Sequence, residues 1–100
     1  MPKIIEYFGL IFYFYANEHE PIHVHVSYNE FESVFEIFFE DGNLTDVQIR
    51  NVRGIEPLPQ KQLKEAQKVV ELYALNIVEK WMDFFILNKK PTIIKITKRI

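Results

Sequence analysis

The sequence predicts an α+β domain, with an antiparallel sheet of three to five strands and one long C-terminal helix packed on one face. In the first half of the chain, apolar and polar residues alternate with the period of a β-strand. From Gln60 to about Leu87, apolar residues instead recur every three or four positions, the period of an amphipathic helix. Strands followed by a helix are typical of α+β folds. A chain of 100 residues is sized for one core, so residues 1–100 are predicted to form a single domain.

Three strands are expected before the strongest turn of the chain. Gly9 to Ala16 is aromatic and β-branched without polar interruption, which favours a strand. Ile22 to Tyr28 and Phe31 to Phe39 alternate with period two and are separated by two residues. That spacing predicts a β-hairpin.

The rest of the chain supplies two further strands and the helix. The turn Asp41-Gly42-Asn43 precedes a fourth candidate strand, Leu44 to Ile49, and Thr92 to Thr97 has the composition of a last short one. The helix is expected to begin after Pro59 and to bury Trp81 in the core. At about 1.5 Å per residue it would be roughly 40 Å long, so a break near Asn76 is an alternative to one long helix.

The two-residue loop at positions 29 and 30 also sets the register of its hairpin. Val24 should lie opposite Phe35 on the apolar face, and His23 opposite Glu36 on the other. Antiparallel pairing of the first strand places two tyrosines beside the histidines. The polar face is therefore expected to gather Tyr13, Tyr15, His23, His25, Ser27, Glu32 and Glu36, with Asn17, Glu18 and His19 on a loop at its end.

A metal site is one hypothesis for this polar face. His23 and His25, two residues apart on a strand, point the same way and could share a divalent ion such as Zn²⁺ or Ni²⁺. Glu36 or His19 would be a third ligand. Histidines at this spacing also arise often by chance, so the pattern alone is weak evidence for a metal.

Metal-free acid–base chemistry on RNA is a second hypothesis. His23 or His25 would exchange protons with Glu36, and tyrosine rings would stack on bases. Phosphate binding needs cations, yet residues 1–46 hold nine acidic residues and only Lys3 as a basic one. Residues 47–100 hold eleven basic and five acidic residues, which gives either a basic surface for an acidic partner or ordinary ion pairs.

The third hypothesis is an amphipathic sheet surface that forms a dimer or a partner interface, because Tyr and His are common on half-wet faces. The absence of cysteine excludes disulfides, thiol catalysis and zinc–thiolate sites, and fits a reducing cytoplasm. No run of about 18 apolar residues is present, so neither secretion nor membrane spanning is expected.

The segment Phe14-Tyr-Ala-Asn-Glu-His-Glu-Pro-Ile-His-Val-His-Val26, with Leu63, Val70, Trp81, Phe84 and Phe85 after it, resembles domain of unknown function family 4160, a family of small bacterial domains. Ile22 departs from the Pro-Pro that precedes the second histidine in that family. The resemblance implies a candidate site at Asn17, Glu18, His19, His23 and His25 and names no catalytic residue. Family members often lie beside genes of another small-domain family, which implies a protein partner, as in a toxin–antitoxin pair.

The expected function is that of a small accessory domain that acts through a protein partner, with the polar face as its working surface. A toxin–antitoxin-like pair is one form of such a partnership. The enzymatic alternative is a histidine-dependent ribonuclease or a metal-dependent hydrolase that uses the same polar face.

Overall fold

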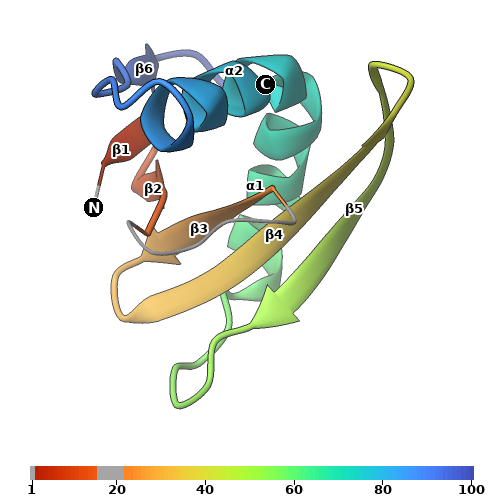
Figure 1. Cartoon of the computed structure of the whole chain (residues 1–100). Coiled ribbons are helices and arrows are strands. Elements are labelled where there is room, and N and C mark those ends of the chain that lie inside the picture. The colour runs from red at the N-terminus through yellow and green to blue at the C-terminus, as the bar shows by residue number, and fades with distance from the viewer. Residues whose placement is uncertain (1, 16–21) are drawn as a thin grey trace.

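The computed structural model describes residues 2–15 and 22–100, which form an α+β fold with a six-stranded sheet and two helices on one side of it (Figure 1). The strands of these described residues are β1 (Lys3–Tyr7), β2 (Leu10–Tyr13), β3 (His23–Tyr28), β4 (Phe31–Glu40), β5 (Asn43–Asn51) and β6 (Ile94–Ile96). The helices α1 (Gln60–Leu72) and α2 (Ala74–Phe85) lie between β5 and β6 in the chain.

The α+β class is confirmed, but the sheet is larger than predicted and is not purely antiparallel. Its strand order is β5-β4-β3-β2-β1-β6, and β1 pairs with β6 in parallel. The prediction missed β1 because Ile4 and Ile5, which are adjacent, are both fully buried, at a register shift in the β1–β2 pairing. A strand that contains such an irregularity lacks the period-two pattern. Gly9, placed within a strand by prediction, lies instead in the β1–β2 turn with a φ of 87°.

The prediction of a single long helix was also wrong. Helix α1 ends at Leu72 and α2 begins at Ala74, with Tyr73 between them at φ −105° and ψ 20°, away from helical values. The break therefore comes before the position near Asn76 that the sequence suggested. One straight helix of roughly 40 Å would overrun a molecule whose longest extent is 33 Å, whereas two shorter helices both keep an apolar side on the sheet.

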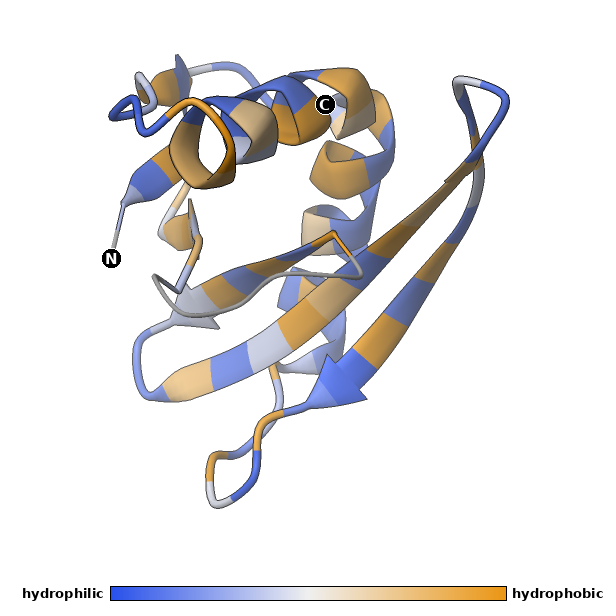
Figure 2. Cartoon of the chain, in the orientation of Figure 1, coloured by the Kyte–Doolittle hydropathy of each residue, from blue (hydrophilic) through white to orange (hydrophobic). Residues whose placement is uncertain are grey.

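The predicted register of the β3–β4 hairpin is confirmed. Val24 pairs with Phe35 and His23 with Glu36, and hydrophobic and hydrophilic bands alternate along these strands in Figure 2. One polar residue, Ser33, lies on the core face and is fully buried. Its Oγ accepts a hydrogen bond of 3.1 Å from the backbone N–H of Leu58, which joins β4 to the segment before α1.

The last two predicted strands are also present. The turn at Asp41 and Gly42 has positive φ at both residues, 53° and 80°, as tight hairpin turns require. The strand after it, β5, forms one edge of the sheet. Near the other edge, Nζ of the buried Lys80 donates to the carbonyl oxygen of Thr92 at 2.6 Å and so fixes the chain just before β6. Neither described helix has the length and apolar character that crossing a bilayer requires.

Candidate functional site

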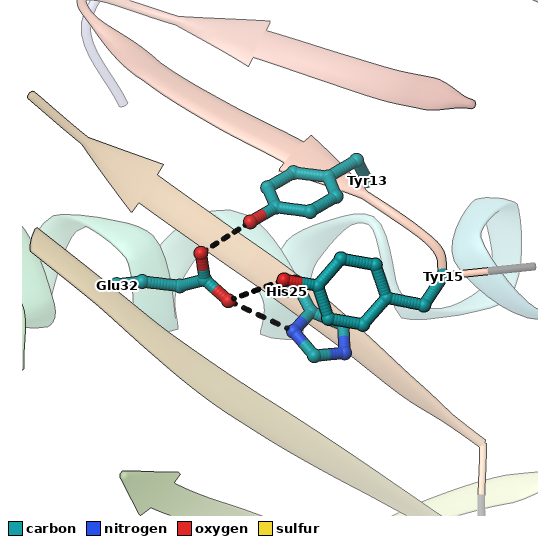
Figure 3. A network of polar contacts seen from close by, with 4 residues as sticks. All are labelled: Tyr13, Tyr15, His25 and Glu32. Carbon is teal, nitrogen blue, oxygen red and sulfur yellow. Dashed lines mark hydrogen bonds and ion pairs between the residues drawn. The ribbon is translucent and has the colours of Figure 1, made fainter. Parts of the chain in front are cut away.

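Three side chains converge on the carboxylate of Glu32 (Figure 3). The hydroxyl of Tyr13 donates to Oε1 at 2.5 Å and that of Tyr15 donates to Oε2 at 3.2 Å. Nδ1 of His25 lies 3.1 Å from Oε2. These four residues, Tyr13, Tyr15, His25 and Glu32, are called the glutamate cluster below.

The pairing of three neighbouring strands brings the glutamate cluster together. Tyr13 on β2 lies directly opposite His25 on β3. On β4, Glu32 lies opposite Ser27, so it is the diagonal neighbour of His25 on the same face. Tyr15 lies just beyond the end of β2, and its hydrogen bond to Glu32 places its hydroxyl on the same face. The prediction that these residues share the face away from the helices is confirmed by this register.

Three of the four residues of the glutamate cluster are buried and Tyr15 is half-buried, so this part of the polar face is less exposed than the half-wet surface that the sequence suggested. The exposed fraction of His25 is 3%, and Tyr13 and Glu32 are also buried. Aromatic rings account for much of this cover: the ring centroid of Tyr15 is 3.9 Å from that of His25, and that of Tyr13 is 5.6 Å away. A buried carboxylate is costly unless it accepts hydrogen bonds, and Glu32 has a donor on each oxygen.

The hydrogen bonds of the glutamate cluster fix which atoms carry protons. Burial, followed by the hydrogen bond to Glu32, raises the pKa of Tyr13 well above its ordinary value, so its hydroxyl stays a donor. A carboxylate only accepts hydrogen bonds, so Nδ1 of His25 carries the proton that it shares with Glu32. A carboxylate that orients an imidazole in this way is a common element of acid–base sites.

The remaining candidate ligands that the structure describes are His23 and Glu36. The His23 ring is buried 5.5 Å from that of His25, and Glu36 lies opposite His23. Oε2 of Glu36, however, lies 3.4 Å from Nε of Arg50, in a partly exposed ion pair. In the parts of the chain that the structure describes, no three His, Asp or Glu side chains are placed to hold a metal ion. The other predicted candidates, Asn17, Glu18 and His19, lie outside the described residues, so a Zn²⁺ or Ni²⁺ site stays a prediction.

A pocket of about 300 Å³ adjoins the glutamate cluster. Lys3, Ile11, Tyr13 and Ser27 line it. Tyr13 and Ser27 were predicted site residues, whereas Lys3 was not, because its strand was not recognised. Lys3 pairs with Tyr13 across β1 and β2, which places it beside Tyr13 in the lining of this pocket. Lys3 is the one charged residue among the described residues of this lining, and an ammonium group forms strong hydrogen bonds with anionic groups.

A second feature that the sequence reasoning missed lies on the helices. Four large apolar side chains are exposed along the side of α2 that faces away from the sheet and at its two ends: Leu72, Leu75, Met82 and Ile86. They are called the apolar stripe below. Their spacing of three, seven and four positions is helical and could have revealed the stripe, but a stronger apolar pattern, which forms the core, overlaps it.

Comparison with known proteins adds one finding. The family model described as Domain of unknown function (DUF4160) matches residues 9–82, from the β1–β2 turn to α2, and so spans the glutamate cluster. No curated protein and no solved structure matches the chain. Since the match covers well over half of the sequence, the chain belongs to the DUF4160 family, as its histidine-containing motif predicts.

Proposed function

We propose that this domain is an interaction module that binds a different protein through the apolar stripe. The observation that carries the proposal is that α2 is apolar on two opposite sides. Ile77 and Trp81 are buried on its inner side, while Leu75 and Ile86 are 67% and 61% exposed on its outer side. A helix with one face in a core normally has a polar outer face. Figure 2 shows several hydrophobic segments along α2.

The apolar stripe ends in a pocket that can receive an anchoring side chain. This pocket, of about 300 Å³, lies between the β4–β5 hairpin and the α1–α2 junction. Leu72 and Leu75 line one side of it, and Phe39 and Leu44 line the other. Interfaces draw most of their affinity from a few large side chains that enter such pockets, and contiguous exposed apolar surface marks interaction sites.

The charges around the apolar stripe indicate what kind of segment binds there. Glu71 lines the pocket, and Glu79 and Asp83 lie on α2 between members of the stripe. The twelve residues of α2 extend over about 18 Å, which matches a partner helix of similar length. The occupant we propose is therefore an amphipathic helix of another protein with apolar anchors flanked by Lys or Arg.

In this proposal the working surface lies on the helices and not on the polar face that the sequence suggested. His23 and His25 are buried, so they offer little area to a partner. The glutamate cluster instead cross-links β2, β3 and β4, which form the sheet against which both helices pack. A toxin–antitoxin-like pair is one form that such a partnership can take.

Titration of purified components tests the proposal. The first partner to assay is the product of the adjacent gene, followed by proteins that are recovered with the tagged domain and then purified. The variant Leu75→Glu/Ile86→Glu should weaken binding about a hundredfold, because both side chains are highly exposed members of the stripe and each would place a charge in the interface. The matched control is Ile55→Glu/Ile93→Glu, which changes two exposed isoleucines elsewhere and should leave the affinity unchanged. Equal affinity of the stripe variant and the wild type would refute the proposal.

Acid–base catalysis is a second candidate function, and Tyr13 is the observation that favours it. Its ring lines the pocket beside Lys3, and its hydroxyl bonds the carboxylate that also contacts His25. A phosphate held by Lys3 would thus lie beside Tyr13, whose hydroxyl is the first group of a hydroxyl–carboxylate–imidazole chain, and general acid–base catalysis by a ribonuclease or another phosphoester hydrolase uses groups of these types.

Two assays test this second candidate. RNA cleavage measured from pH 5 to 8 should show an optimum that His25→Ala abolishes, and cleavage no faster than in buffer would exclude a ribonuclease. Equilibrium dialysis with Zn²⁺ and Ni²⁺ tests the metal-dependent hydrolase. If His23→Ala/His25→Ala binds these ions as tightly as the wild type does, the histidines are not ligands.

A further inference from the structure

Strand β5 forms a long open edge of the sheet. It neighbours β4 alone, and within the described part of the chain residues 43–51 make no backbone hydrogen bond to any other segment. It has nine residues, whereas β6 at the opposite edge has three. An exposed strand edge of this length is a template for pairing with a further strand.

The backbone groups of Val47 and Ile49 point toward this open edge. On β4, the N–H of Ile37 donates to the carbonyl oxygen of Ile22, on the β3 side. Ile37 and its partner Val47 are therefore not a hydrogen-bonded pair, and by alternation neither are Phe35 and Ile49. The N–H of Val47 accordingly donates to the Asp46 carboxylate, at 2.9 Å, instead of to β4.

The side chains of β5 are arranged symmetrically on either side of Gln48, with opposite charges at matching positions. Asp46 and Arg50 flank it at two residues on either side, with opposite charges and on the same face of the sheet. Val47 and Ile49 flank it at one residue on either side and lie on the face of the helices. Ile49 is 40% exposed there, which is unusual for an isoleucine on a core-facing position.

We infer that β5 pairs with β5 of a second copy of this chain, antiparallel and centred on Gln48, so that two sheets join into one. Asp46 of each copy then lies opposite Arg50 of the other copy, so the two-fold symmetry gives two ion pairs. Val47 and Ile49 become the hydrogen-bonded pairs, and their side chains cover each other on the helix face. The Asp46 carboxylate exchanges its contact with the Val47 N–H for the guanidinium group of the second copy.

Neighbouring registers lack this complementarity. Centring the two-fold axis on Asp46 brings that carboxylate against its own copy. Centring it on Val47 places Asp46 opposite Gln48 and Arg50 opposite Leu44, which leaves both residues without an oppositely charged residue directly across in the second copy. Like charges directly opposite are destabilising, and opposite charges are stabilising.

Charged residues also serve to keep strand edges apart. Keeping edges apart requires only that charged residues are present, whatever their sign or position. Opposite signs at equal distances from one residue are instead what two-fold pairing requires. An interface made by one strand pair is smaller than a standard one, so the expected dissociation constant is about micromolar or weaker.

Sedimentation equilibrium of the full chain from about 5 to 500 μM tests the inference. The wild type should dimerise. Asp46→Arg and Arg50→Asp should each weaken the dimer about tenfold or more, because each creates two like-charge pairs across the axis. The double variant Asp46→Arg/Arg50→Asp should restore it. Glu30→Arg and Arg53→Asp make the same charge changes in exposed turns and should leave the dimer unchanged.

Two results would overturn the inference. One is a wild type that stays monomeric throughout this range. The other is a dimer whose stability the single reversals do not alter or the double variant does not recover. Circular dichroism of each variant confirms that β5 still folds, since Asp46 and Arg50 also contact Gln48 and Glu36 within the chain. Failure of this dimer test would leave the proposed function intact, because binding of a different protein to the apolar stripe is measured in a separate titration.

Discussion

The Tyr13 hydroxyl and the Glu32 carboxylate join β2 to β4 across the intervening strand β3. The same carboxylate contacts His25 on β3. One buried side chain thus binds residues of three adjacent strands in addition to their backbone hydrogen bonds. Because the donors to Glu32 come from different strands, a change at Glu32 should affect the whole sheet rather than one strand.

Glu32→Gln should lower the free energy of unfolding by about 1–3 kcal/mol, the usual effect of leaving buried polar groups unsatisfied. Glutamine has one accepting oxygen, whereas three donors meet the two oxygens of Glu32. Urea unfolding followed by circular dichroism measures the difference. Glu30→Gln in the exposed turn is the matched control and should change the value by less than about 0.5 kcal/mol. If both variants unfold alike, the glutamate cluster does not stabilise the sheet.

Tyr13 should make the protein less stable at alkaline pH. Burial and the hydrogen bond to Glu32 raise the pKa of Tyr13 in the folded state above the ordinary value of 10.0. Above about pH 10 the unfolded chain therefore loses this proton while the folded chain keeps it. The free energy of unfolding should fall by up to about 1.4 kcal/mol per pH unit from this group.

Tyr13→Phe tests this pH dependence. The variant should be less stable at pH 8, by about 1.5–3 kcal/mol, because Glu32 loses a donor. Between pH 9 and 11 its stability should decline less steeply than that of the wild type. Tyr73→Phe, a half-buried position outside the glutamate cluster, controls for the removal of a hydroxyl group. Parallel slopes for Tyr13→Phe and the wild type would contradict the raised pKa.

The sequence was sufficient to predict the β3–β4 register and the face on which the glutamate cluster lies. A clean alternation on both strands and a two-residue loop leave one pairing that brings apolar residues together. The partner of His25 could not be predicted in this way. Glu36 lies directly opposite His23, yet it is the diagonal Glu32 that reaches His25. Which diagonal contact forms depends on sheet twist and side-chain reach, and periodicity contains neither.

The missed features have a common physical origin. Ile4 and Ile5 are both buried, so β1 does not alternate, and Lys3 therefore could not be placed beside Tyr13. Helix α2 is apolar on both sides, so its pattern continues through Tyr73 with no sign of a break. In both cases long-range packing overrides a local pattern.

Ser33→Ala should lower the free energy of unfolding by about 1–3 kcal/mol, since the backbone N–H of the buried Leu58 would lose its acceptor. Hydrogen exchange at the Leu58 amide should become faster in the variant. Ser27→Ala, at a half-buried position on the opposite face, is the matched control. Unchanged exchange at Leu58 would show that the Ser33 hydroxyl group does not hold this segment.

Lys80→Met should release the C-terminal segment from α2. Nζ of Lys80 donates to the carbonyl oxygen of Thr92 at 2.6 Å and to its Oγ1 at 3.1 Å. The Lys80 side chain is buried, as is that of its sequence neighbour Trp81. Methionine fills nearly the same volume without the ammonium group, so the packing of α2 is kept while both hydrogen bonds are lost.

Amides of β6 should then exchange with solvent at least about tenfold faster, because losing hydrogen bonds to a charged group costs about 1.5–3 kcal/mol and the strand is only three residues long. Lys68→Met on the exposed side of α1 is the control and should leave this exchange unchanged. Since β6 pairs in parallel with β1, opening should also expose the amides of β1 that face β6 while those that face β2 stay protected. If amide exchange instead became faster by the same factor in all strands, Lys80 would support the fold as a whole.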